Sequence, residues 1–432
     1  MSHDPDEKQH AARQTVMSVL PAPKGLRLHI GLFGLRNAGK SSLINALSGQ
    51  NISIVSSEPG TTTDPVEKAY ELSPVGPVVF VDTAGTDDTG ELGLERVRRS
   101  LKVMEWVDLA IVAIPAGDAL RDEEKRLLER MKARALPAVV TLTHSDLARS
   151  SEALRKTLSG YGFPVVETAA RDAASIGRLR EALVRLAREH TEPDKALTEG
   201  LVGPGDTVLL VTPIDIGAPK GRLILPQVQT LRELLDAHAR VLVVQVDQVR
   251  AMLEDLRHPP ALIITDSQVV LEVARQTPDS IALTTFSILM GASKSDIIAL
   301  AQGCAALSRL QDGDRVLILE TCSHHPQKDD IGRVKIPRWL REKTGKDLRI
   351  DIAVGKDIPD DFTPYKVLIQ CGGCVVTRRH MLSRLAQANA QHIPMTNYGM
   401  TISFLQGLIE RVLKAHPEAL AAYRAACGGQ QF

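Results

Sequence analysis

Gly34-Leu-Arg-Asn-Ala-Gly39-Lys40-Ser41 is the stretch that decides the fold of the first part of the chain. It fits Gly-x-x-x-x-Gly-Lys-Ser/Thr, follows the apolar strand pattern Leu26–Phe33 and opens the helical pattern Lys40–Ser48. A strand, a glycine-rich turn and a helix in this order direct successive backbone N–H groups at a phosphate chain. We therefore predict a P-loop in which Lys40 reaches the β- and γ-phosphates and Ser41 binds Mg²⁺.

Apolar strand patterns alternate with helical patterns beyond this loop. Such alternation is typical of a mostly parallel sheet that is covered by helices on both faces. The expected strands are Val78–Val81, Leu109–Ile114, Ala138–Leu142 and Pro164–Thr168, and the expected helices are Gly93–Val107, Asp122–Ala135 and Ile176–His190.

The rest of the chain is predicted to form two smaller α/β domains with mostly parallel sheets. Glycine and proline gather in Glu192–Asp206, which indicates a linker, and two further sets of strand patterns follow. The predicted organisation is a tail, 1–24, a P-loop domain, 25–195, and two α/β domains, 196–286 and 287–432. The later strands are expected at Thr207–Val211, Arg240–Val246, Ala261–Thr265, Ile281–Thr284, Arg315–Leu319, Leu348–Val354, Lys366–Gln370 and Pro394–Asn397, with a helix at Pro226–Ala239.

The composition argues against several classes of protein. Lys+Arg and Asp+Glu both total 52 of 432 residues, so a strongly basic nucleic-acid binder is not expected. Aromatic residues make up only 3%, which argues against base-stacking platforms. No apolar run is long enough to span a membrane, and the charged start of the chain does not resemble a secretory signal. Five cysteines do not make a disulfide framework, so we expect a cytoplasmic protein.

Two further motifs fit the phosphate end of a nucleotide site. Asp82-Thr-Ala-Gly85 follows a predicted strand, so the Asp82 carboxylate suits the surroundings of Mg²⁺ and the Gly85 N–H can approach a γ-phosphate. Between the P-loop and this motif lies Gly60-Thr-Thr-Thr-Asp64. We favour Thr62 as an Mg²⁺ ligand that responds to the γ-phosphate, and a plain threonine-rich turn is the alternative.

Thr143-His144-Ser145-Asp146 follows the strand pattern Ala138–Leu142, and at this motif the chain resembles the translation-factor-like GTPases, in particular the MnmE/TrmE branch. The resemblance implies that Asp146 recognises guanine, that His144 replaces the usual lysine along the base, and that Ala169 contacts the guanine oxygen. The GTP-binding residues implied are Gly34, Asn37, Ala38, Gly39, Lys40, Ser41, Ser42, Asp82, Gly85, Thr143, His144, Asp146, Thr168 and Ala169.

The same resemblance bears on catalysis. It implies that Asn37 binds a K⁺ ion at the place where other GTPases receive an arginine finger, so we expect faster turnover in K⁺ than in Na⁺. The catalytic set is then Lys40, Thr62, Gly85 and Asn37. Thr86 follows Gly85 where Ras-like enzymes carry a water-orienting glutamine, so we expect slow intrinsic hydrolysis. Orientation of water by Asp87, Asp88 or Glu91 and a merely solvated acidic loop both remain open.

Three of the five cysteines lie in two short motifs, Cys322-Ser-His324 and Cys371-Gly-Gly-Cys374. Each motif follows a predicted parallel strand, so the two loops are expected to meet at one edge of a sheet. Thiolates suit an iron–sulfur cluster or zinc: three thiolates and one exchangeable ligand fit [4Fe–4S], and a Cys₃His zinc site or incidental buried cysteines are the alternatives. His324 is either a fourth ligand or a neighbour of the ligands.

With these motifs, residues 25–415 resemble the [FeFe]-hydrogenase H-cluster maturation GTPases, the HydF family. The resemblance also rests on the segments Pro213–Gln229, Thr265–Gln268, Asp330–Pro337 and Thr396–Gly399. The family pattern is Cys-x-His followed by His-Cys-x-x-Cys, and here Gln370 replaces the second histidine. The resemblance implies a [4Fe–4S] cluster on Cys322, Cys371 and Cys374, with the fourth iron position open or occupied by water, His324, His325 or an exogenous group.

The resemblance further implies what the protein does and with what. It implies a homodimer that hydrolyses GTP, receives a diiron precursor and passes it to the [FeFe]-hydrogenase apoprotein, with radical SAM maturases as the other partners. In this resemblance 196–286 is the dimerisation domain and 287–432 is the iron–sulfur cluster-binding domain. An RNA-linked GTPase of the MnmE kind is the first alternative. A GTPase whose third domain is held together by structural zinc is the second.

Overall fold

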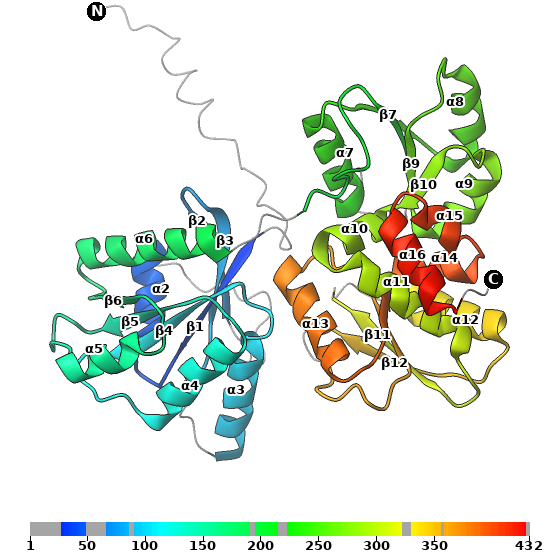
Figure 1. The fold of residues 1–432 in the computed structure, drawn as a ribbon. Coiled ribbons are helices and arrows are strands. Elements are labelled where there is room, and N and C mark those ends of the chain that lie inside the picture. Colours follow the sequence, from blue (N-terminus) through cyan, green and yellow to red (C-terminus); the bar gives the residue numbers. More distant parts are fainter. Residues whose placement is uncertain are drawn as a thin grey trace, which may run out of the picture.

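The computed structural model describes residues 27–48, 66–85, 90–190, 195–214, 223–321, 330–355 and 358–428. The chain builds three sheets, and each carries helices on its faces (Figure 1). The fold is α/β throughout, as the alternating patterns predict. None of the helices in the described ranges is both long and apolar enough to cross a membrane.

The first sheet has six strands in the order β2-β3-β1-β4-β5-β6. All neighbours are parallel except β2 and β3, which pair antiparallel. The sequence patterns predict every strand of this sheet except the antiparallel edge strand β2. The strands are β1 Leu28–Gly34, β2 Val66–Leu72, β3 Gly76–Asp82, β4 Leu109–Pro115, β5 Ala138–Thr143 and β6 Val165–Glu167.

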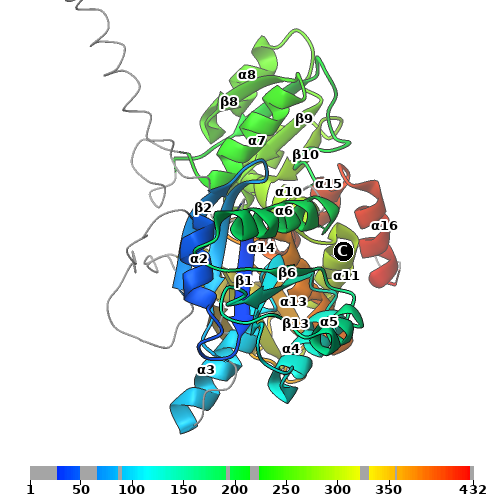
Figure 2. The same ribbon diagram turned by 90° about the vertical axis from the view of Figure 1, so that its left-hand side faces the viewer.

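Helices cover both faces of this sheet. Helices α2 and α6 pack on one face, and α3, α4 and α5 pack on the other (Figures 1 and 2). Helix α5 has no counterpart among the predicted elements, and α3 begins and ends earlier than its apolar pattern suggests. The helices are α2 Lys40–Ser48, α3 Gly90–Val103, α4 Asp122–Ala133, α5 Glu152–Ser159 and α6 Ala173–His190.

The second sheet has four parallel strands in the order β10-β9-β7-β8. Its strands consist largely of β-branched and other aliphatic residues, as expected of parallel strands that are covered on both faces. The strands are β7 Thr207–Val211, β8 Arg240–Val244, β9 Leu262–Thr265 and β10 Ala282–Thr285, and the helices are α7 Leu225–Asp236, α8 Val249–Asp255, α9 Val270–Gln276 and α10 Phe286–Lys294, with 3₁₀ turns Val246–Gln248 and Ser267–Val269.

The third sheet also has four parallel strands, in the order β12-β11-β13-β14. The strands are β11 Arg315–Glu320, β12 Arg349–Val354, β13 Val367–Gln370 and β14 Met395–Asn397. The helices are α11 Ile297–Ala305, α12 Ile336–Thr344, α13 Arg378–Ala390, α14 Tyr398–Leu405, α15 Ile409–Leu413 and α16 Pro417–Ala426, with a 3₁₀ turn Ala306–Arg309 and a π-helical turn Ile331–Lys335.

The second and third sheets share one hydrophobic core. A single cluster of buried side chains runs from Leu209 and Ile263 of the second sheet to Leu317 and Ile369 of the third. Helix α10 contributes to this cluster through Ile288 and to the core on the other face of the second sheet through Phe286 and its neighbours. The last two sheets therefore form one packed body.

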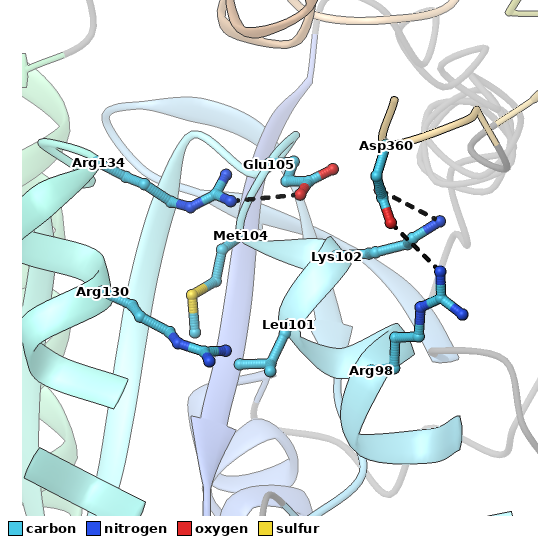
Figure 3. A pocket seen from close by; sticks show the side chains of 8 residues that line it. All are labelled: Arg98, Leu101, Lys102, Met104, Glu105, Arg130, Arg134 and Asp360. Atoms are coloured by element: carbon cyan, nitrogen blue, oxygen red, sulfur yellow. Dashed lines mark hydrogen bonds and ion pairs between the residues drawn. The ribbon is translucent and has the colours of Figure 1, made fainter. Parts of the chain in front are cut away.

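The first sheet's domain touches this body through helices α3 and α4. Arg98 and Lys102 of α3 lie 3.2 and 3.8 Å from the carboxylate of Asp360, which belongs to the loop after β12. Figure 3 shows these side chains at a pocket of about 260 Å³ that Arg130 of α4 and Arg134, the residue after this helix, also line. Ion pairs thus join the helix that follows the Asp82–Gly85 motif to the third sheet.

Candidate functional site

The P-loop connects β1 to α2, and its backbone conformation depends on glycine at two positions. Gly34 has φ +145° and Gly39 has φ +84°. A Cβ atom at Gly34 would lie 2.4 Å from the Ala113 carbonyl oxygen of β4, so only glycine lets the loop pass the sheet. Asn37, the residue implied to bind K⁺, lies between them with φ 61° and is exposed.

Lys40 and Ser41 begin α2 and lie beside the carboxyl end of β3. The Lys40 ammonium donates to the carbonyl oxygens of Gly34 and Leu35 at 3.0 and 2.7 Å, so the buried cation lies within the loop. The Ser41 hydroxyl donates to Asp82 Oδ2 at 2.8 Å. Two of the three proposed Mg²⁺ residues, which lie 41 positions apart, are therefore in direct contact.

The Asp82 carboxylate fits a divalent cation. Its Oδ1 atom is buried without a hydrogen-bond partner in the described structure, which leaves one acceptor available. Burial raises the pKa of Asp82, while the Ser41 hydroxyl and the positive charges of Lys40 and Lys68 lower it. A cation between Ser41 and Asp82 would satisfy the orphaned oxygen and the buried charge together. Lys68 belongs to β2, so the sequence patterns gave no signal for it.

The base-recognition motifs meet the P-loop from β5 and β6. The Thr143 hydroxyl donates to the Ala38 carbonyl at 2.9 Å, and this bond ties the motif to the loop. A Cβ atom at Gly39 would lie 3.2 Å from His144 Nε2, so the imidazole lies over the P-loop glycine. His144 has φ 57°, and Asp146, two residues on, is exposed at the rim. The structure thus brings the predicted Asp146, His144 and P-loop residues to one sheet edge.

The Thr168–Ala169 motif lies beside the Thr143–Asp146 motif, and its backbone groups form hydrogen bonds within the protein. Thr168 shares a 2.7 Å hydrogen bond with Thr141 and accepts from the Ser145 N–H at 3.2 Å. The Ala169 N–H, which is expected to meet guanine, donates to the Ser175 hydroxyl at 3.0 Å. Ser175 therefore competes for this N–H, and the sequence motifs alone did not point to it.

Several expected catalytic residues lie outside the described residues, namely Thr62, Thr86, Asp87 and Asp88. The side chain of Glu91 is likewise outside the described part. Gly85 is described and buried at the end of the Asp82 motif. The predicted roles of all these residues remain predictions.

The second site lies at the carboxyl ends of β11 and β13, which are parallel neighbours in register Leu319↔Gln370. Cys371 directly follows β13, and its thiol is buried. The Cys371 Sγ lies 3.2 Å from the Thr321 backbone N–H and 2.9 Å from the Thr321 hydroxyl. Thr321, which directly precedes Cys322 in the sequence, therefore contacts Cys371. Cys322, His324 and His325 themselves lie outside the described residues.

The loop from Cys371 to Cys374 is held from helix α10. The Lys294 ammonium, 1% exposed, donates to the carbonyl oxygens of Gly373 and Val376 at 3.2 and 2.7 Å. Gly373 has φ +64°, and a Cβ atom there would lie 2.7 Å from the Met381 sulfur. Cys374 is partly exposed and packs against the core that contains Phe286. The sequence patterns did not identify Lys294, the last residue of α10, as part of this site.

The donor set suits a cluster bound by thiolates. The Thr321 N–H that donates to the cysteine sulfur, together with the buried Lys294 cation behind the loop, favours an anionic group at this position. No group of three or more metal-ligating side chains occurs within the described ranges, which hold Cys371 and Cys374 but not Cys322. The choice between a [4Fe–4S] cluster and zinc therefore stays a prediction. Cys304 is fully buried, and its pKa is raised by that burial.

Three of the segments on which the family resemblance rests are joined by side-chain contacts. Glu320, 2% exposed, pairs with Arg333 at 3.0 Å and accepts from the Tyr398 hydroxyl at 3.4 Å. Lys335 donates to Gln268 at 2.7 Å. Residues of Asp330–Pro337 thus contact Thr396–Gly399 through Glu320 and contact Thr265–Gln268 through Lys335, and the sequence patterns did not point to Glu320.

Comparison with protein families gives three matches along the chain. Residues 298–415 match the hydrogen maturase F tetramerization domain, and residues 197–295 match the hydrogen maturase F dimerization domain. Residues 29–144 match the family described as 50S ribosome-binding GTPase.

Curated relatives match less than half of this chain. The tRNA modification GTPase MnmE of Heliobacterium modesticaldum is 37% identical over 161 residues, which is 36% of this chain and 33% of the relative. MnmE of Thermus thermophilus is 40% identical over 199 residues, 42% of this chain and 43% of the relative. The chain therefore spans less than half the length of these relatives.

Among solved structures, Era of Aquifex aeolicus bound to GDP.AlF4- is 18% identical and covers 50% of this chain and 92% of that chain, with a TM-score of 0.32 that is too low to carry an argument. The two maturase F matches carry more weight, because they cover most of the second and third sheets. With a GTPase domain in front of both, the chain belongs to the hydrogen maturase F (HydF) family of TrmE/Era-like GTPases.

Proposed function

We propose that this chain is a GTP-hydrolysing carrier that assembles the diiron precursor of the [FeFe]-hydrogenase cofactor and hands it to the apoenzyme. One observation carries the proposal: a P-loop site with a fitting Mg²⁺ pair and a thiol loop with buried donors belong to one chain of the maturase F family. The radical SAM maturases are its suppliers and the hydrogenase apoprotein is its acceptor.

The hydrolytic site works through charge and positioning. Lys40 neutralises the β- and γ-phosphates, and Mg²⁺ is held by Ser41, Asp82 and Thr62. The Gly85 N–H contacts the γ-phosphate, while K⁺ on Asn37 supplies the charge that an arginine finger supplies elsewhere. Equal hydrolysis rates in K⁺ and Na⁺ would remove the Asn37 assignment.

The cargo site is proposed to be a [4Fe–4S] cluster on Cys322, Cys371 and Cys374. The Thr321 N–H and the Lys294 cation support an anionic group at the loop. When bound, the cluster offers one iron that three thiolates leave exchangeable. His324 completes this iron or lies beside it.

Nucleotide state is proposed to reach the cargo site through α3. This helix follows the Asp82–Gly85 motif, and its Arg98 and Lys102 pair with Asp360 at the third sheet. Arg379 of α13, the helix that follows the cysteine loop, donates to the Ala135 carbonyl at 3.1 Å at the end of α4. A shift of α3 or α4 on hydrolysis would therefore bear on both sides of the cysteine loop. The proposal fails if the GTP and GDP forms bind the maturases and the hydrogenase identically.

The chain is proposed to act as a homodimer through its second sheet. Three large apolar side chains are strongly exposed on α7 and the edge strand β8, namely Val228, Leu235 and Val243 at 46%, 55% and 45%. An edge strand with an apolar face beside it is a surface that a second copy can cover. The matched dimerization domain contains this surface, and the matched tetramerization domain suggests further association of dimers.

Anaerobic reconstitution tests the proposed function. Wild type and Cys371→Ser are purified in parallel, iron, sulfide and zinc are quantified, and EPR spectra are recorded after reduction with dithionite. About four irons per chain with a [4Fe–4S] signal that is lost in the variant would support the carrier. Stoichiometric zinc, or no metal in a folded wild type, would overturn it and leave a GTPase with a structural third sheet.

A further inference from the structure

Gln370 is the last residue of β13 and is 1% exposed, at the position where the family pattern has histidine. Its side chain has three contacts. The amide oxygen accepts from Arg384 Nη1 at 2.9 Å, and the amide nitrogen lies 3.3 Å from the Leu319 carbonyl oxygen and 3.5 Å from Cys371 Sγ. Residue 370 thus touches the sulfur that precedes the two loop glycines.

The chemistry of its neighbours fixes which way the amide points. An arginine side chain carries only donors, so the atom of Gln370 that faces Arg384 must be the oxygen. A backbone carbonyl only accepts, so the atom that faces Leu319 must be the nitrogen. Both constraints give the same orientation, which directs an N–H group toward the Cys371 sulfur.

Arg384 is itself held in one place. It lies on α13, is 2% exposed, and donates through Nη2 to the Gly355 carbonyl at 2.7 Å after β12. Within the described residues no carboxylate pairs with it, and its Nε atom has no hydrogen-bond partner. Burial lowers the pKa of Arg384 to about 10, and the Cys371 sulfur is the group that opposes this shift. A buried guanidinium in this position favours negative charge at the cysteine loop.

We propose that Arg384 is a positioning residue: it engages the Gln370 oxygen, so residue 370 serves as a hydrogen-bond donor to the Cys371 sulfur and not as a metal ligand. The inference rests on the proposed cluster. The oxygen is the amide atom that could bind iron, and Arg384 occupies it. The Cys371 sulfur then receives donors from Thr321 and Gln370 together, and these donors stabilise the more negative, reduced form of the cluster.

The test compares reconstituted full-length wild type with Gln370→Leu and Arg384→Met, using metal content, EPR line shape and the midpoint potential from an EPR-monitored titration. We expect both variants to keep four irons and a [4Fe–4S] line shape and to shift the midpoint potential to more negative values. The matched control is Gln387→Met on the same helix, where the lost amide contacts the Asp360 carbonyl and not a cysteine, and we expect no shift.

Two outcomes would overturn the inference. Loss of one iron or a [3Fe–4S] signal in Gln370→Leu would make residue 370 a ligand, and unchanged potentials in both variants would remove the hydrogen bond as a determinant. If Arg384→Met fails to fold, as judged by its melting curve, Gln370→Leu decides alone. Zinc or no cluster in wild type would refute the proposed function and this inference with it, whereas failure confined to the variants refutes only the inference.

Discussion

The nucleotide site and the cysteine site both lie at the carboxyl ends of parallel strands, but they are built differently. The P-loop is one contiguous segment. Gly34 and Gly39 allow its backbone conformation, and Lys40 donates to the carbonyl oxygens of the same loop. The cysteine loop depends on distant side chains, because Lys294 and Arg384 reach it from α10 and α13. A contiguous site can be recognised from a motif, whereas a site assembled by buried charges needs the fold.

The largest effect on activity is expected at the P-loop. Lys40→Ala removes the cation that neutralises the phosphates, so we expect GTP hydrolysis to fall by about 10²–10³-fold. Single-turnover hydrolysis measures the loss, and the iron content after reconstitution serves as the comparison, since the two sites are separate. An equal loss of iron would mean that the sites are not independent.

In the domain that holds the cysteine site, we expect the loss of a buried charge's partner to lower the free energy of unfolding. Arg333→Ala leaves the carboxylate of Glu320, which is buried, without its cation, so we expect about 3 kcal/mol of destabilisation in denaturant unfolding. Arg338→Ala on the following helix removes an exposed pair with Glu342 and should cost less than about 0.5 kcal/mol. Similar losses in the two variants would show that the Glu320–Arg333 pair does not hold the third sheet.

These differences mark what the sequence can predict. The P-loop, the Asp82 motif and all four strands of the second sheet follow from local patterns, because backbone geometry and apolar periodicity decide them. The edge strand β2 was missed, since Val66–Leu72 carries charged residues on an antiparallel edge. Arg384 could not be linked to Gln370, because it lies 14 positions away within the next helix and only tertiary packing brings the two side chains together.

An effect of intermediate size is expected at Asp82, whose carboxylate is proposed to bind Mg²⁺ although its burial disfavours the ionised form. Because its folded pKa is raised, ionisation opposes folding, so nucleotide-free stability is lower above the folded pKa and rises as pH falls through it. Asp82→Asn should therefore raise the melting temperature at neutral pH without nucleotide and abolish stabilisation by Mg²⁺ and GTP. A lower melting temperature in the absence of nucleotide would contradict this account.

The smallest effect concerns the contact between the two regions. Arg98 and Asp360 are more than half exposed, so their pair should contribute about 0.5 kcal/mol in a double-mutant cycle of Arg98→Ala and Asp360→Ala. High salt should weaken it further. A coupling energy well above 1 kcal/mol would mean that the domains are locked together more firmly than exposed charges allow.

The shared core of the last two sheets has a consequence during synthesis on the ribosome. Helix α15, close to the end of the chain, packs against β10 of the second sheet, and Arg411 donates to the Thr277 carbonyl at 2.8 Å beside it. Strand β10 of the second sheet therefore leaves the ribosome long before α15, one of the helices that pack against it. A nascent chain halted between the two sheets would leave exposed the apolar surface that α15 covers in the complete fold, and such surface favours aggregation of folding intermediates.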